Sequence, residues 1–177
     1  MPGDWRDYID AAHRKSHIAA FHCEQLRHAL TNCPPPHDGR PDIPTQAFFE
    51  GAVVATVSAI DQVAQAANSA LSLKLDAGKL FDGAIPEIEK RVPEFKAWRE
   101  QPIGRDLRRL RVRMVHYSYG KSQSGEPSWQ VEVADANYTG SRELYAYAQA
   151  AASYVQELAT IADKLQKSLA ASSQAAG

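Results

Sequence analysis

Apolar residues recur every three or four positions along four long stretches of the chain, which is the spacing of a helix with one buried face. These stretches cover residues 4–31, 44–74 and 103–119, and a last one that begins near Ser141. Between residues 76 and 102, several glycines and prolines allow only short helical turns. We therefore predict an all-α fold, an up-and-down helical bundle of four principal helices plus short helical turns.

The connections between these helices are marked by composition. The length of 177 residues predicts one domain, 1–177. Four prolines interrupt residues 32–43, which predicts a long non-helical connection. Residues 120–139 read as a loop or an extended arm, where Trp129–Val133 alternates like a short strand without an obvious partner. We expect residues 170–177 to be a frayed tail.

The second predicted helix, 44–74, is apolar nearly all round. Such a helix is either central in its own fold or in contact with another subunit. Because its apolar surface exceeds what one helical face needs, we expect a homodimer. No segment reads as a leader or as a membrane span, so we expect a soluble cytoplasmic protein with no membrane partner.

Charge is unevenly distributed along the chain. The total is −1 at pH 7, which excludes a polycation that coats nucleic acid. Residues 96–121, however, carry eight lysines and arginines against Glu100 and Asp106, a local net charge of +6. A field of that sign attracts phosphate groups or an acidic protein surface.

The predicted helix 103–119 carries most of this charge beside a candidate general acid or base. Its apolar stripe is Ile103, Leu107, Leu110, Met114 and Tyr117. A second face carries Arg105, Arg109, Arg113 and His116, while Arg108 and Arg111 flank the stripe. An imidazole can move protons near neutral pH, and a guanidinium can hold phosphate oxygens through paired hydrogen bonds. Together they supply what metal-independent cleavage of an RNA phosphodiester requires.

The segment Leu110–Tyr117 resembles the motif of HEPN domains, in which an arginine is followed four to six residues later by a histidine, late in a helical bundle. The resemblance implies a dimer in which two arginine–histidine pairs line one cleft, and an RNA- or nucleotide-binding function. It further implies a metal-independent endoribonuclease of a toxin–antitoxin or phage-defence system, with an antitoxin as one kind of protein partner. Val112 stands where the family usually has a polar residue, and Ser118 departs from the histidine–any–tyrosine ending of some members.

Carried onto this chain, the resemblance makes Arg111 and His116 the catalytic pair. Arg109 satisfies the same spacing and shares a helix face with His116. The phosphate-binding candidates are Arg105, Arg108, Arg109 and Arg113, and the supporting candidates are Asp61, Tyr117 and Tyr119. We expect neither a cofactor nor a metal.

Two other interpretations stay open. The basic helix could be a solvated face, or it could belong to a non-catalytic binding module that docks an acidic partner protein. Internal pairing of its arginines with Asp61, Glu94, Glu100 or Asp106 would favour the binding module.

Other residue types offer weaker chemistry. His13 and His17 are spaced as a metal-binding pair, but a surface pair is the commoner outcome. Trp98 and Trp129 are better read as packing residues than as platforms for bases, and the two cysteines form no zinc motif or disulfide framework.

Overall fold

The computed structural model of the chain describes residues 4–32, 43–76, 78–116, 121–125, 128–134 and 139–175, with side chains in these ranges except at 43, 111–145 and 173–175. Six helices account for most of this part of the chain, which confirms the predicted helical character. The proline-rich segment 33–42 and Cys33 lie outside the described residues.

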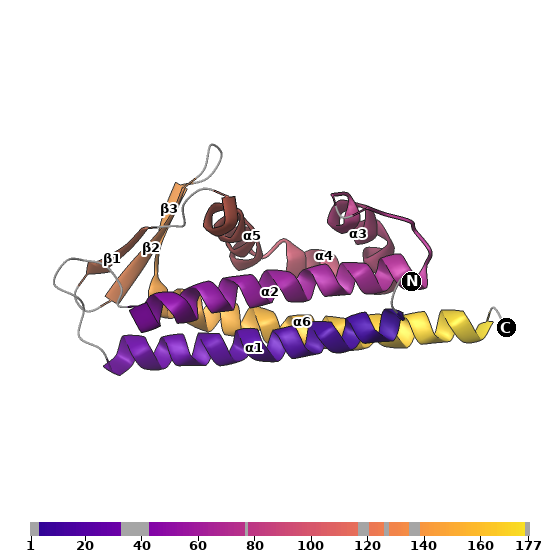
Figure 1. Cartoon of the computed structure of the whole chain (residues 1–177), viewed down its shortest axis with the longest axis horizontal. Coiled ribbons are helices and arrows are strands. Elements are labelled where there is room, and N and C mark those ends of the chain that lie inside the picture. The colour runs from indigo at the N-terminus through magenta and orange to yellow at the C-terminus, as the bar shows by residue number, and fades with distance from the viewer. Residues whose placement is uncertain are drawn as a thin grey trace.

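Three long helices lie side by side along the molecule: α1 (Trp5–Asn32), α2 (Ile43–Ala70) and α6 (Leu144–Ala175) (Figure 1). The chain runs along α1, turns back along α2, and runs along α6 in the direction of α2. Between α2 and α6 it returns through three shorter helices: α3 (Leu80–Arg91), α4 (Glu94–Arg99) and α5 (Pro102–His116). These three lie on one side of the long helices (Figure 1).

Helix α2 is central in the fold. It packs against α1, α3, α5 and α6, so most of its circumference is covered within one copy of the chain. This agrees with its nearly continuous apolar composition. By length and composition, Pro44–Ala70 could also cross a membrane, since its most apolar window has a mean hydropathy of 1.3. Because 56% of that window is buried against the other helices, the core of a folded domain explains the same pattern.

Prolines divide the return path into its three helices. Pro93 precedes α4 and Pro102 opens α5, a position where a missing N–H costs no hydrogen bond. Pro86 lies inside α3, which is a helix of 12 residues rather than the isolated turns that we predicted around this proline. Burial of Leu80, Ala84 and Ile88 along one face offsets the cost of that interruption.

A turn with two strained residues joins α2 to α3. Ser72 and Lys74 have positive φ angles of 51° and 56°, which cost energy in residues other than glycine. The side chain of Asn68 stabilises this turn. Its amide donates to the carbonyl of Leu75 at 3.2 Å, and its oxygen accepts from the N–H of Leu75 at 3.0 Å.

An antiparallel sheet of three strands precedes α6, in the order β1 (Lys121–Gly125), β2 (Ser128–Ala134) and β3 (Thr139–Glu143). The predicted strand at 129–133 is confirmed within β2. The sequence showed no obvious partner for this strand and suggested a loop or extended arm over 120–139; in the structure β2 pairs with both β1 and β3. The sequences of β1 and β3, KSQSG and TGSRE, lack the alternation of apolar residues that predicts strands.

The last helix begins later and ends later than the apolar pattern suggested. Ser141 belongs to β3, so α6 starts at Leu144. The helix then continues to Ala175, into the segment that we predicted to fray.

Candidate phosphate-binding helix

Helix α5 buries the apolar stripe that the sequence predicted. Ile103, Leu107 and Leu110 are all buried, and the helix packs against α2 and α6. The other two members of the stripe, Met114 and Tyr117, lie outside the described side chains. In the part that is described, α5 therefore has one fixed inner face and one face toward solvent.

The first turn of α5 is held against α6 by a very close contact. A Cβ atom placed on Gly104 would lie 2.3 Å from the hydroxyl oxygen of Tyr154, which is fully buried. The Tyr154 ring stacks on the indole of Trp98 with centroids 4.2 Å apart, and Trp98 Nε1 donates to the Tyr154 carbonyl at 2.9 Å. Phe95 continues the stack at 5.5 Å. These contacts fix α4 and α5 to α6, and they confirm Trp98 as a packing residue.

Arg108 is a partly buried arginine at the same junction. Its Nη2 donates to the carbonyl of Arg99 at 3.4 Å, and its guanidinium lies 5.9 Å from the centroid of the Phe81 ring. Burial lowers the pKa of Arg108, an effect opposed by attraction to Tyr154 and reinforced by the nearby charge of Arg99. Burial likewise raises the pKa of Tyr154, so the phenol stays neutral. Much of the Arg108 side chain is thus engaged inside the protein.

Arg105 is more available than Arg108. Its side chain is exposed and makes no hydrogen bond or ion pair with any residue that the structure describes. Arg109 is half-buried on the same face, and Asp106, between them in sequence, is buried. In the first half of α5, Arg105 therefore faces solvent, whereas Arg108 contacts other residues inside the protein.

The acidic residues near α4 pair mainly with other cations. Glu94 forms an ion pair with Lys164 of α6. Arg99 lies 3.2 Å from Glu89 and 3.8 Å from Glu100. Among the described side chains, neither Glu94 nor Glu100 forms an ion pair with an arginine of α5. Asp61 is half-buried on α2 and takes part in contacts within the chain.

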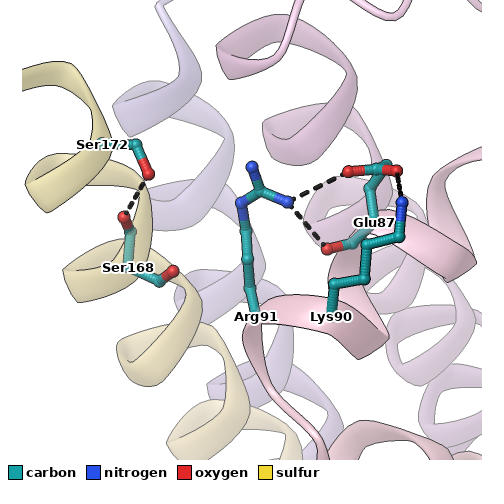
Figure 2. A network of polar contacts seen from close by, with 5 residues as sticks. All are labelled: Glu87, Lys90, Arg91, Ser168 and Ser172. Carbon is teal, nitrogen blue, oxygen red and sulfur yellow. Dashed lines mark hydrogen bonds and ion pairs between the residues drawn. The ribbon is translucent and has the colours of Figure 1, made fainter. Parts of the chain in front are cut away.

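Helix α3 provides a contrast to α5. Glu87 binds Lys90 and also accepts from Arg91 at 3.1 Å, so both cations share one carboxylate (Figure 2). A second bond runs from Arg91 to the Glu87 carbonyl at 3.2 Å. Two hydrogen bonds and the adjacent charges hold the pKa of Glu87 below its ordinary value. The positive charge of α3 is therefore largely satisfied locally, unlike that of Arg105.

The predicted catalytic pair lies in the second half of α5. The backbone of Arg111, Arg113 and His116 is helical, and His116 is the last residue of α5. Their side chains lie outside the described ones, and so do Tyr117 and Tyr119 altogether. On a helix, Arg113 shares the face of His116, whereas Arg111 lies about 140° away. The pair Arg111–His116 and the support of the two tyrosines stay predictions.

Neither His13 nor Cys23 belongs to a second centre among the described residues. His13 Nε2 lies 3.2 Å from Asp163 of α6, while His17 is exposed. Across the described part of the chain, no group of three potential ligands could hold a metal ion. Cys23 is buried and free, and burial raises its pKa to about 11, so its thiol is unreactive at neutral pH.

A shallow groove of about 330 Å³ lies between α4 and α6 and was not predicted. The side chains of Trp98 and Ile161 contribute to its lining. Two polar contacts span it, one from Lys164 to Glu94 and one from Gln101 to Glu157 at 2.8 Å. The residues come from distant parts of the sequence, so no local pattern could have indicated this groove.

Comparison of this chain with protein-family models, with curated proteins and with solved structures finds no match.

Proposed function

We propose that this chain is a HEPN-like up-and-down helical bundle that dimerises and binds the phosphate groups of RNA or of a nucleotide through α5. In this proposal His116 transfers protons, and Arg111, with Arg109 or Arg113, holds the phosphate. Cleavage of RNA without a metal is the reaction that such a pair supports. The 2′-hydroxyl loses a proton and attacks the adjacent phosphorus, and the 5′-oxygen leaves with a proton, which gives a cyclic phosphate end.

The observation that carries the proposal is the exposed cation Arg105 on α5, in a stretch of strongly positive local charge. Arg105 is exposed and unpaired among the described residues, whereas the lysine and arginine of α3 share Glu87. Residues 96–121 have a net charge of +6 in a chain whose total is −1. Lysines and arginines that contact the phosphates of a polyanion gain binding energy from the release of counterions.

The first test measures RNA binding by fluorescence anisotropy at a series of salt concentrations. Changing Arg109, Arg111 and Arg113 to glutamine together should weaken binding. It should also make the slope of log K against log salt shallower by up to about 2, as expected for three lost contacts to single-stranded RNA. The matched control removes three cations elsewhere, in the variant R14Q/K79Q/K167Q, whose three sites are exposed on α1, just before α3 and on α6.

The two variants have the same net charge, so only the position of the lost cations differs. If both variants bind RNA with the same affinity, α5 contributes only to the overall charge of the protein and does not form an RNA-binding site. Unchanged affinity of the α5 variant would mean that its arginines form a solvated face. Binding of an acidic protein, with no binding of RNA or nucleotide, would favour the non-catalytic docking module.

The second test addresses catalysis. The protein should cleave RNA in the presence of a chelator and leave a cyclic phosphate end. His116→Ala should abolish cleavage while the circular dichroism spectrum keeps its helical form. Arg111→Gln should lower the rate on the order of 10²-fold, by analogy with the removal of one donor to a charged transition state. If the protein leaves a panel of structured and unstructured RNAs intact, the ribonuclease assignment is refuted. The proposed binding of RNA would then be decided by the salt-dependent binding experiment alone.

A further inference from the structure

The groove between α4 and α6 combines an apolar floor with polar ends. It encloses about 330 Å³, at the small end of the range for ligand sites. Trp98 and Ile161 line it and are only 3% and 4% exposed, while the small side chain of Ala97 is exposed at its wall. The lining residues all come from α4, α6 and Gln101, so the groove is separate from the arginines of α5.

The floor of the groove is fixed by the packing behind it. The Trp98 indole stacks with the rings of Phe95 and Tyr154, at centroid distances of 5.5 and 4.2 Å. Its Nε1 donates to the Tyr154 carbonyl at 2.9 Å, which sets the position of the ring. Because the floor is ordered by the fold itself, a ligand that binds there loses little affinity to the ordering of side chains.

A polar contact closes each end of the groove. At one end Lys164 forms an ion pair with Glu94, and at the other Gln101 Nε2 donates to Glu157 Oε2 at 2.8 Å. Lys164 and Glu157 are seven residues apart on α6, a helical rise of about 10 Å. The apolar floor between the two contacts therefore has the length of an aromatic ring with a polar head group.

The two ends of the groove differ in charge. Lys164 neutralises Glu94, whereas Glu157 bonds the uncharged amide of Gln101 and forms no ion pair with any residue that the structure describes. Two carboxylates against one ammonium leave the lining with a net charge of −1, and this charge lies at the Glu157 end. The ligand whose charge complements the groove is therefore a cation.

We propose that this groove binds a small organic cation, with a planar amidinium or guanidinium head at Glu157 and a flat apolar body on Trp98 and Ile161. A planar head of this kind donates two parallel hydrogen bonds to one carboxylate. The apolar body displaces water from the floor and adds a hydrophobic contribution that a bare cation lacks. The groove repels phosphate groups, so its ligand is distinct from the one proposed for α5, and the two proposals can fail separately.

The first experiment titrates the ¹⁵N-labelled protein with benzamidine, which has both the proposed head and the proposed body. The indole N–H resonance of Trp98 should shift and saturate, with a dissociation constant on the order of 1 mM for a ligand of this size. The indoles of Trp5 and Trp129 serve as internal controls, and the variants Trp5→Phe and Trp129→Phe assign the signals.

Two analogues of benzamidine separate the head from the body. Benzamide has nearly the same shape without the charge, and it should bind about 5-fold more weakly, the upper end of what an exposed ion pair contributes. Acetamidine has the charged head without the ring. Its binding should be weaker than that of benzamidine, because it leaves the apolar floor in contact with water.

The second experiment changes the groove itself. Glu157→Gln should weaken benzamidine about 5-fold and leave benzamide unchanged, because only a charge is removed. Asp10→Asn, at an exposed site on α1, is the matched control for that charge. Ala97→Leu should abolish binding of both compounds, because the larger side chain fills the groove. Ala47→Leu makes the same change at an exposed site on α2 and should have no effect.

The proposal is overturned if benzamidine gives no saturable shift of the Trp98 indole, or shifts all three indoles alike. It is equally overturned if Glu157→Gln binds benzamidine as tightly as wild type. Binding to an Ala97→Leu protein whose circular dichroism spectrum is that of wild type would also sink it. Weaker binding in both groove variants, with both controls unchanged, would establish the site, whatever the RNA assays show.

Discussion

Replacing Gly104 by alanine tests how closely the basic helix sits on α6. The new Cβ would lie 2.3 Å from the hydroxyl oxygen of Tyr154 and 2.7 Å from its Cζ. The tyrosine has little room to move, because its ring is fully buried and stacked 4.2 Å from Trp98. The clash must therefore be relieved by a shift of α5 itself.

The expected magnitude follows from two opposing effects. Forcing an extra methyl into a packed core costs about 1–3 kcal/mol, and this contact is severe enough for the upper end of that range. Alanine regains up to about 1 kcal/mol through its higher helix propensity. The free energy of unfolding should therefore fall by about 2 kcal/mol, and the melting temperature by roughly 4–8 °C in a domain of this size.

The assay is urea and thermal denaturation followed by circular dichroism. Gly78→Ala is the control, since its Cβ would meet only Asp76 Oδ1 at 3.5 Å, and it should stay within about 0.5 kcal/mol of wild type. Adding Tyr154→Phe to the Gly104 variant should recover part of the loss, because the nearest atom is removed. A Gly104→Ala protein as stable as wild type would refute the close contact between α5 and α6.

Three further predictions concern the Asn68 side chain in the turn between α2 and α3, the backbone of that turn, and the stability of the protein at acid pH. Asn68→Ala should lower the free energy of unfolding by about 1–3 kcal/mol, because it leaves both backbone groups of Leu75 without their partner, as urea denaturation can measure. Lys74→Gly should raise it by up to about 1 kcal/mol in the same assay, because glycine adopts a φ of 56° without strain; a loss of stability would show that the angle carries no cost. Hydrogen bonding from Lys164 holds the pKa of Glu94 below its ordinary value of 4.5, so its contribution is present above that pH and is lost as pH falls through the lowered value. Denaturation midpoints across this range should therefore fall less steeply in Glu94→Gln than in wild type, and parallel curves would contradict this linkage.

Local periodicity was sufficient to predict the long helices, because each has an apolar face whose spacing is set by the helix itself. It also predicted the strand within β2 from the alternation of Trp129–Val133. It did not identify β1 or β3, whose polar and glycine-containing sequences become strands only by pairing with β2. The continuous helix through Pro86 was missed because burial of its apolar face, a tertiary effect, outweighs the proline.

The candidate site was predictable in composition but not in its contacts. The run of arginines and the buried stripe through Leu110 follow from spacing along α5. The partial burial of Arg108 does not, because it depends on Phe81 and Tyr154, which are distant in sequence. The same holds for the closeness of Gly104 to Tyr154, where only the small size of residue 104 offered a signal.

The contact at Gly104 fixes α5 at its N-terminal end, so a small tilt there displaces its C-terminal end. From residue 104 to His116 the helix rises by about 18 Å, at 1.5 Å per residue. A tilt of about 5° at Gly104 would therefore displace the C-terminal end of α5 by roughly 1.5 Å. In enzymes, a misplacement of about 1 Å can lower the rate by about 10²-fold. If the proposed ribonuclease activity exists, substitutions in the stack of Phe95, Trp98 and Tyr154 should change its rate by moving the proposed Arg111–His116 pair, although they touch neither residue.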